Sequence, residues 1–267
     1  MSVLVISDVH ADICAFEAIL SITTDKRFMQ KYSEVEMILN LGDTVERGYH
    51  PREVIDKLKA LETKLPVISL RGNHDEALLL DRPVSGSDMR SREAHANPTA
   101  YVSFLRALPD CYLNRANHVL AVHGGPIDPS VLGNDWLYGR SWQRISSRSY
   151  LDASGYHYTP REAFEHVKQT YGAGYVILCG HDHDEAAYSD RLGDLLKVMR
   201  AEQSRYAGYR VTSLWITRDP STSYLVRVGI AGPEGYHRVG RERSHFGLMW
   251  RHNGRERIGL FSFTPIP

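Results

Sequence analysis

The sequence predicts an α/β protein with a β-rich C-terminal part, and two observations carry this prediction. From residue 3 to about 183, short β-branched runs alternate with longer stretches typical of helices. After about residue 184 the pattern changes to alternating segments separated by turns, at 207–217, 222–230, 243–251 and 255–263. No internal repeat or low-complexity linker divides the chain, so we expect one domain over residues 1–267, with 184–267 as its β-rich part.

Five short apolar runs are predicted to be buried strands. They cover Val3–Ile6, Met37–Leu41, Val67–Leu70, Val119–Val122 and Tyr175–Cys179. The first three are joined by short crossovers, and this spacing favours parallel strands.

The predicted helices share a capping residue or a proline at their start. They run from Asp12 to about Thr24, from Pro51 to about Leu61, from Pro98 to Leu108 and from Pro160 to about Tyr171. Residues 81–98 are expected to form a polar loop. Residues 126–159 are rich in Gly, Ser, Tyr and Trp, and we interpret them as a candidate cap or insertion.

Composition excludes several classes of protein. The 32 basic and 32 acidic residues cancel, whereas a protein that binds duplex nucleic acid usually carries a basic excess. No apolar run approaches the roughly 18 residues of a membrane span, and the N-terminus lacks the basic region of a signal peptide. Three distant cysteines, Cys14, Cys111 and Cys179, do not indicate a disulfide framework. We expect a cytoplasmic protein that binds neither duplex nucleic acid nor a membrane.

Each of the five predicted strands ends in a motif with metal-binding side chains. In order, the motifs are Asp8-x-His10, Gly42-Asp43, Gly72-Asn73-His74-Asp75, His123-Gly124 and Gly180-His181-x-His183. Open α/β sheets bind ligands outside the carboxyl ends of their strands. The motifs are therefore expected to converge, although 175 positions separate Asp8 from His183.

Seven of these side chains offer oxygen or imidazole donors: Asp8, His10, Asp43, Asn73, His123, His181 and His183. Seven donors are too many for one first-row ion and suit two, with Asp43 as the natural bridging carboxylate. Two ions roughly 3.5–4 Å apart would clamp a phosphoryl oxygen and lower the pKa of a bridging water, giving a hydroxide nucleophile. His74 would then be surplus as a ligand and is a candidate general acid, which Asp75 could orient.

These motifs, together with Arg47-Gly48 and Gly125, resemble the five motifs of the calcineurin-like metallophosphoesterases in order and spacing, over residues 3–183. The resemblance implies a four-layer αββα sandwich with two mixed β-sheets and flanking helices. It assigns one ion to Asp8, His10, Asp43 and His183, and the other to Asp43, Asn73, His123 and His181. It also implies that His74 is the general acid and that Asp75 is its partner.

Two branches of that family compete as guides to the substrate. The segments GDTVERGYHPREVIDKL, RGNHDEALLL, FLRALPDCYL and VHGGPIDP resemble small bacterial and archaeal phosphodiesterases, which include diadenosine tetraphosphate hydrolases. The segment VRVGIAGPEGYHRVG resembles their C-terminal Gly-rich strand and loop. We therefore expect a nucleotide-type phosphodiester or a dinucleoside polyphosphate as the small phosphorylated substrate.

The other branch is that of the Ser/Thr protein phosphatases, which would act on phosphomonoesters. Arg47-Gly48 and Leu70-Arg71-Gly72-Asn73-His74 resemble these enzymes and the symmetric diadenosine tetraphosphate hydrolases. Both groups usually carry Asp where this chain has Glu46, and both lack a ligand at the position of His183. Phosphoprotein is therefore the alternative substrate.

Two arginines are candidate substrate contacts. Arg47 could hold a phosphate as a charged fork, or it could lie in a surface loop. Arg140, Arg144 and Arg148 are spaced by four and would share a face if their segment is helical. Among the neighbouring tryptophans, Arg140 could help to bind a nucleotide, and the alternative is a solvated helix face.

The expected cofactor is a pair of divalent ions, with manganese first and iron, zinc, nickel or cobalt as alternatives. A rival of another class is a catalytically silent scaffold, because one subunit of the retromer coat resembles this branch but serves as a binding platform. A scaffold would be expected to have a replaced general acid. His74 and all seven ligands are present here, which favours an enzyme. The sequence leaves the oligomeric state open.

Overall fold

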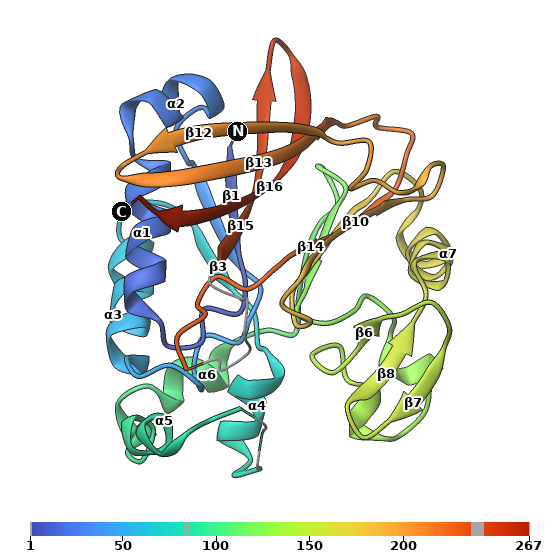
Figure 1. Ribbon diagram of the computed structural model, residues 1–267. Coiled ribbons are helices and arrows are strands. Elements are labelled where there is room, and N and C mark those ends of the chain that lie inside the picture. The colour runs from blue at the N-terminus through green and yellow to red at the C-terminus, as the bar shows by residue number, and fades with distance from the viewer. Residues whose placement is uncertain (1, 83, 85, 236–242, 267) are drawn as a thin grey trace.

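The computed structural model describes residues 2–82, 84, 86–235 and 243–266 (Figure 1). Two large mixed sheets pack face to face, and helices cover both outer faces. The four-layer αββα sandwich that the resemblance implied is therefore confirmed. In the part of the chain that the structure describes, no helix is long and apolar enough to cross a membrane.

The seven-stranded sheet contains the first three strands of the chain. Its order is β12 (Arg200–Tyr206), β13 (Tyr209–Thr217), β16 (Arg255–Pro265), β15 (Ser244–His252), β1 (Val3–Ile6), β2 (Met37–Asn40) and β3 (Val67–Ser69). Strands β1, β2 and β3 are parallel, as their short crossovers predicted. Their carboxyl ends therefore lie at one edge of the sandwich.

The six-stranded sheet contains the other two predicted strands. Its order is β11 (Gly193–Asp194), β10 (Glu185–Ser189), β14 (Tyr224–Val228), β9 (Val176–Cys179), β5 (Val119–Val122) and β4 (Cys111–Asn114). Strands β5, β9 and β14 are parallel to one another. The five strands that end in polar motifs are thus divided between two sheets.

Burial on both faces explains why these strands are continuously apolar. Successive residues of a strand point to opposite faces. In β1, Val3 and Val5 pack between the sheets, whereas Leu4 and Ile6 pack under the helices. The hydrophobic run that predicted a buried strand follows from this double burial.

Four helices form the outer layers. Helices α1 (Ile13–Thr23), α2 (Lys26–Tyr32) and α3 (Pro51–Glu62) cover the seven-stranded sheet, and α7 (Pro160–Tyr171) covers the six-stranded sheet (Figure 1). The predicted caps are present. The Asp12 carboxylate accepts a hydrogen bond from the backbone N–H of Ala15, and Thr159 and Glu162 form a capping box at α7.

The segment between β3 and β4 departs from the prediction in two places. The expected polar loop 81–98 contains a short helix, α5 (Met89–Ala94), because the Asp88 carboxylate caps the backbone N–H of Ser91. The expected helix from Pro98 to Leu108 is interrupted at Tyr101, which lies between a 3-10 turn (Pro98–Ala100) and α6 (Val102–Ala107). Helix α4 (Asn73–Leu79) begins directly at the third motif.

Residues 126–158 form a small region beside the two sheets, which we call the small-sheet segment. It contains two 3-10 turns (Pro129–Val131 and Trp136–Tyr138) and a three-stranded sheet of order β6 (Arg144–Ile145), β8 (Gly155–Tyr158), β7 (Tyr150–Asp152). The helical face proposed for Arg140, Arg144 and Arg148 is therefore wrong. The turn at Trp136–Tyr138 ends at Gly139, a second turn follows in which the Trp142 N–H donates to the Gly139 carbonyl, and β6 begins at Arg144.

The C-terminal part is shared between both sheets. The predicted β segments correspond to β13, β14, β15 and β16, but the sequence pattern did not reveal β10, β11 and β12. The Gly-rich segment expected at 226–240 is described only up to residue 235, and 236–242 lie outside the described residues. Within it, the backbone N–H of Gly232 donates to the Asp8 carbonyl, so this loop packs directly against the first motif.

Candidate metal centre

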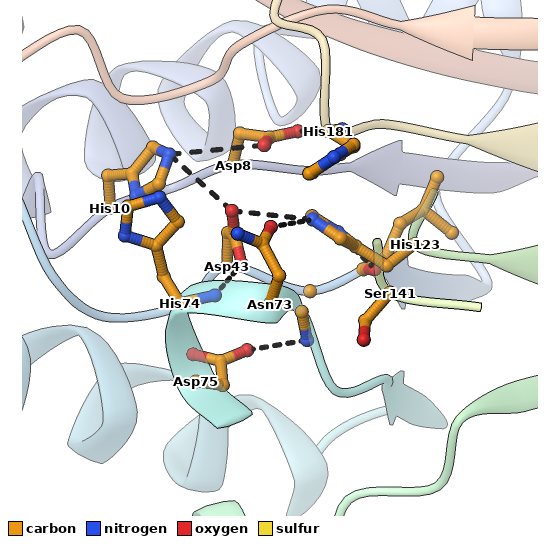
Figure 2. Close-up of polar contacts among 12 residues, drawn as sticks. Asp8, His10, Asp43, Asn73, His74, Asp75, His123, Ser141 and His181 are labelled. Carbon is orange, nitrogen blue, oxygen red and sulfur yellow. Dashed lines mark hydrogen bonds and ion pairs between the residues drawn. The ribbon is translucent and has the colours of Figure 1, made fainter. Parts of the chain in front are cut away.

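The carboxyl ends of β1, β2, β3, β5 and β9 meet between the two sheets, and their motif side chains gather there. Figure 2 shows Asp8, His10, Asp43, Asn73, His123 and His181 around one centre. Three groups of side chains each hold their candidate ligand atoms within 4.8 Å of one another. Those groups are Asp8–His10–His183, His10–Asp43–His74 and Asp43–His123–His181.

The first group lies at the end of β1. His183 Nε2 is 3.4 Å from Asp8 Oδ1 and 3.2 Å from His10 Nε2. His10 Nε2 is also 3.8 Å from Asp43 Oδ2. Three imidazole or carboxylate donors from β1 and from the loop after β9 thus face one point, with Asp43 beside them.

The group Asp43–His123–His181 lies against the six-stranded sheet. His123 Nε2 is 3.3 Å from Asp43 Oδ2 and 3.2 Å from Asn73 Oδ1. The rings of His123 and His181 are in edge-on contact, with centroids 5.1 Å apart. Asp43 Oδ2 thus lies between His10 of the first group and His123 of this one, which is the position that a bridging carboxylate requires.

The two carboxylates each have one anchored oxygen and one oxygen left without a hydrogen bond. Asp8 Oδ2 accepts the backbone N–H of His181 at 3.0 Å, and Asp43 Oδ1 accepts that of His74 at 2.8 Å. Asp8 Oδ1, Asp43 Oδ2 and His181 Nε2 are buried and make no hydrogen bond to any residue that the structure describes. Buried polar atoms are normally paired, so this set of acceptors fits cations.

The backbone at the motifs is strained. Asp8, His10, Asp43, His181 and His183 have φ of 55°, 48°, 52°, 72° and 67°, in the left-handed region that non-glycine residues seldom adopt. Such strain is retained where the surrounding structure fixes it, and it is common at functional sites.

Close packing explains two of the motif glycines. A side chain at Gly72 would overlap Asp43, and one at Gly180 would overlap Ser7 and Asp8.

Burial and neighbouring charges act differently on the pKa values of the histidines in the centre. Burial lowers the pKa of His10 and His181, and the charges of Arg47 and Arg144, respectively, act in the same direction. These imidazoles are therefore neutral at pH 7, the form that binds a metal. Burial opposes protonation of His123, but the Asp43 carboxylate outweighs it and raises the pKa to about 9. Asp43 is thus a carboxylate that strongly attracts a positive partner.

His74 lies beside the first group. Its ring makes an edge contact with His10 at 4.9 Å between centroids, and its Nε2 is 3.4 Å from Arg47 Nη2. Burial and, more weakly, Arg47 lower its pKa to about 4 despite the attraction of Asp43. The ring is therefore neutral at pH 7 in this state and keeps one N–H.

Asp75 does not orient His74 as the resemblance implied. Its Oδ1 accepts the backbone N–H groups of Thr44 and Val45 at 3.0 and 3.1 Å, and its Oδ2 accepts that of Gly72 at 2.9 Å. Figure 2 shows its carboxylate turned away from the imidazole. Asp75 therefore holds together the loops that carry Asp43 and Asn73.

A cavity of about 620 Å³ opens beside the centre, and Asp43, Asn73, His74, His181 and His183 form part of its wall. Arg47 also lines it. Arg140 is not among the described residues that line it. Its guanidinium donates to the Pro126 carbonyl at 2.6 Å and to Asp128 at 3.3 Å, which corrects its expected role.

Five further side chains in the cavity wall are not among the predicted site residues, although three of them belong to the aromatic and arginine-rich stretch considered for nucleotide binding. They are Trp136, Trp142, Arg144, Asp182 and Arg227. Arg144 belongs to the arginine series that the sequence singles out, of which Arg140 is the predicted substrate contact. Asp182 lies inside the last motif, and that position was the available signal. For Arg227, in a strand, the sequence held no signal.

The fold and the centre agree with comparisons to known proteins. The sequence pattern of the calcineurin-like phosphoesterase family matches residues 1–185, which include all five motifs. The chain therefore belongs to the calcineurin-like phosphoesterase family.

Individual relatives match parts of the chain or its fold. Over 105 residues the chain is 35% identical to a catalytic subunit of protein phosphatase 2A from Dictyostelium discoideum, a match that covers 37% of this chain and 32% of the relative. The matched stretch thus spans about a third of that protein's length.

Two solved structures share the fold at low sequence identity. A metallophosphoesterase from Sphaerobacter thermophilus has a TM-score of 0.59 at 20% identity, covering 100% of this chain and 89% of that one. A protein serine/threonine phosphatase from Saccharomyces cerevisiae has a TM-score of 0.55 at 14% identity, covering 100% and 81%.

Proposed function

We propose that this protein is a phosphohydrolase that depends on two divalent metal ions. The observation that carries the proposal is the pair of buried carboxylates, each with one anchored oxygen and one oxygen that makes no hydrogen bond and faces histidine side chains of the motifs. One ion would be held by Asp8, His10, Asp43 and His183. The other would be held by Asp43, Asn73, His123 and His181. Manganese is proposed first, with iron, zinc, nickel or cobalt as alternatives, because sites of carboxylate and imidazole donors without a thiolate admit all of them.

Bound ions of this kind neutralise charge on a phosphoryl group and make water a nucleophile near neutral pH. The protein's own side chains supply the remaining steps. Arg47 lines the cavity beside His74 and would hold a phosphoryl oxygen. His74 would give a proton to the leaving oxygen, and a bound phosphate anion would favour its protonated form.

The proposed substrate is a nucleotide-type phosphodiester or a dinucleoside polyphosphate. The cavity of about 620 Å³ is large enough for more than a single phosphate group. Trp136, with 45% of its surface exposed, and Trp142 line its wall in edge-on contact. Indole rings of this kind can stack a base.

Phosphoprotein is the second candidate substrate. The observation that favours it is the 35% identity, over 105 residues, to a protein phosphatase 2A catalytic subunit. A panel of dinucleoside polyphosphates, cyclic nucleotides and phosphopeptides, ranked by kcat/KM, separates the two candidates. We expect the nucleotides to rank first, and higher kcat/KM values for the phosphopeptides would reverse the assignment.

The scaffold alternative would require a damaged centre, and the gathered donors and His74 argue against it. The cytoplasmic location stays a prediction, and the three unpaired cysteines are consistent with it.

The activity is tested with bis-p-nitrophenyl phosphate and added Mn²⁺. We expect hydrolysis by the wild-type protein, and strong loss in the Asp43→Asn and His74→Ala variants. Matched controls are Asp56→Asn and His252→Ala, because both side chains are exposed and lie outside the centre. Wild-type rates from Asp43→Asn or His74→Ala would refute the proposal.

A further inference from the structure

Asp182 is the residue between His181 and His183 in the sequence, and its carboxylate accepts hydrogen bonds from two arginines. Its Oδ1 accepts from Arg144 Nη1 at 2.8 Å, and its Oδ2 accepts from Arg227 Nη1 at 2.6 Å. The side chains of Arg144, Asp182 and Arg227 are 25%, 18% and 12% exposed. Each carboxylate oxygen therefore makes a charge-assisted hydrogen bond in a largely buried place, where such bonds are strong.

The two arginines come from different parts of the fold. Arg144 begins β6 of the small-sheet segment, and its Nε donates to the Ser154 carbonyl at 2.9 Å. Arg227 lies in β14, and its Nε donates to the Asp184 carbonyl at 2.6 Å. Asp182 is thus connected at once to the small sheet and to the six-stranded sheet.

The loop that carries Asp182 needs such support. His181 and His183 both have positive φ, at 72° and 67°, a conformation that costs free energy for any residue with a side chain. The paired arginines offer a local reason why the loop keeps this shape, because breaking either contact would leave a largely buried charge without its partner.

A second connection ties the small-sheet segment to helix α4. Ser141 Oγ and Trp142 Nε1 donate to Glu76 Oε2 at 2.9 and 3.3 Å. Glu76 lies on α4, which begins with Asn73 and His74. The segment that supplies Trp142 and Arg144 to the cavity wall is therefore tied to two motifs that face the centre.

We propose that Asp182, Arg144 and Arg227 form a positioning unit, which sets His181 and His183 relative to the small-sheet segment and so couples the metal centre to the substrate wall. The proposal rests on the proposed function, because it takes these histidines as metal ligands. Arg144 is a positioning residue in this account. Its substitution should weaken metal binding and substrate binding together.

The test is calorimetric titration of Mn²⁺ into the wild-type protein, Arg144→Met, Asp182→Asn and the double variant. Loss of a hydrogen-bonding partner of a metal ligand typically weakens affinity about 10- to 100-fold. Asp182 supports the backbone between two ligands and not their rings, so we expect each single variant to lose about tenfold, at the lower end of this range. The double variant should be hardly worse than Asp182→Asn alone, because both changes break one interaction. Arg144→Lys should restore part of the affinity, because it keeps the charge but lacks the fork that also reaches Ser154.

The Arg148 side chain is exposed, and its guanidinium lies over the ring of Tyr150. Arg148→Met is therefore the matched control. Its Mn²⁺ affinity and its KM for bis-p-nitrophenyl phosphate should equal those of the wild type. In Arg144→Met the KM should rise. A purely structural role for Arg144 would lower the melting temperature without changing the Mn²⁺ affinity, and that result would overturn the proposal.

Failure of this proposal and failure of the proposed function give different results. If the wild type binds two Mn²⁺ and hydrolyses the diester, while Arg144→Met and Asp182→Asn bind Mn²⁺ equally well, only the positioning unit is refuted. If the wild type neither binds Mn²⁺ nor hydrolyses the diester, the proposed function is refuted and the positioning unit falls with it.

Discussion

The motif loops and the small-sheet segment lie on either side of one cavity, yet they are built differently. The motif side chains are almost completely buried, their backbone is strained, and several of their polar atoms lack hydrogen bonds within the described chain. Most residues of the small-sheet segment are half-buried or exposed, and several are aromatic. Polar contacts with Glu76 and Asp182 attach the segment to the rest of the protein. The difference suggests that the loops determine the chemistry and the segment determines which substrate is accepted.

The largest expected effect lies in the motif loops. Asp43→Asn removes the carboxylate charge between the two groups, so Mn²⁺ affinity should fall by more than the 10- to 100-fold typical of residues behind a ligand. Calorimetric titration measures this loss against Asp56→Asn. If Asp43→Asn binds Mn²⁺ as tightly as the wild type, the motif loops are not the part of the cavity wall that binds the metal.

His74→Ala should separate chemistry from metal binding. Loss of a positioned proton donor typically costs about 10²- to 10⁴-fold in rate, and we expect kcat for bis-p-nitrophenyl phosphate to fall within this range. The Mn²⁺ affinity should stay close to that of the wild type, because His74 is not assigned as a ligand. Equal loss of kcat and of metal affinity would instead place His74 among the ligands.

Trp136→Ala tests the role of the small-sheet segment. Stacking of a base on an aromatic ring contributes about 1–3 kcal/mol, so KM for a dinucleoside polyphosphate should rise roughly tenfold with little change in kcat. The control substrate is phosphoserine, which has no ring. An equal rise in KM for both substrates would argue against a stacking site at Trp136.

Arg140→Met should change stability and leave catalysis alone. The Arg140 side chain is 10% exposed and donates to Pro126 and Asp128, and hydrogen bonds that involve a charged group contribute about 1.5–3 kcal/mol. A decrease of several degrees in melting temperature is expected, with KM and kcat unchanged. A raised KM would restore Arg140 as a substrate contact.

The smallest expected effect is a pH-dependent one at the capping box of α7. Burial raises the pKa of Glu162, but hydrogen bonds from Ser149 and Thr159 outweigh burial and hold it below the ordinary 4.5. A lowered pKa stabilises the folded state above pH 4.5, and this contribution is lost as the pH falls through the folded-state pKa. The melting temperature of Glu162→Gln should therefore lie below that of the wild type at pH 7, and the two should approach each other by pH 3. A constant difference across this range would contradict the assignment.

The motif loops could be predicted from the sequence because their signal is local. A buried strand that ends in Asp, His or Gly-Asn-His can be recognised from a short stretch of sequence. The parallel topology then brings Asp8 and His183 together. The small-sheet segment could not be predicted in this way. Its fold depends on contacts such as Arg144 with Asp182 and Trp142 with Glu76, which join positions 38 and 66 residues apart.

Two errors have the same origin. The shared face of Arg140, Arg144 and Arg148 depends on a helix in that segment, and the pairing of Asp75 with His74 rests on the family resemblance and on their adjacency in sequence. In the structure, Gly139 is followed by a turn, in which the Trp142 N–H donates to the Gly139 carbonyl, and not by a helix. Helix α4 directs the Asp75 carboxylate to the amides of Gly72, Thr44 and Val45. Sequence proximity identified the right segments but not the direction of each side chain.

The most direct test of the account is the number of Mn²⁺ ions that the protein binds. The account predicts two per chain for the wild type, measured by calorimetric titration and checked by metal analysis after dialysis. It also predicts that bis-p-nitrophenyl phosphate is hydrolysed only when the ions are present. A stoichiometry of one or none, or hydrolysis that continues at the same rate after the metal is removed by a chelator, would contradict a dinuclear phosphohydrolase.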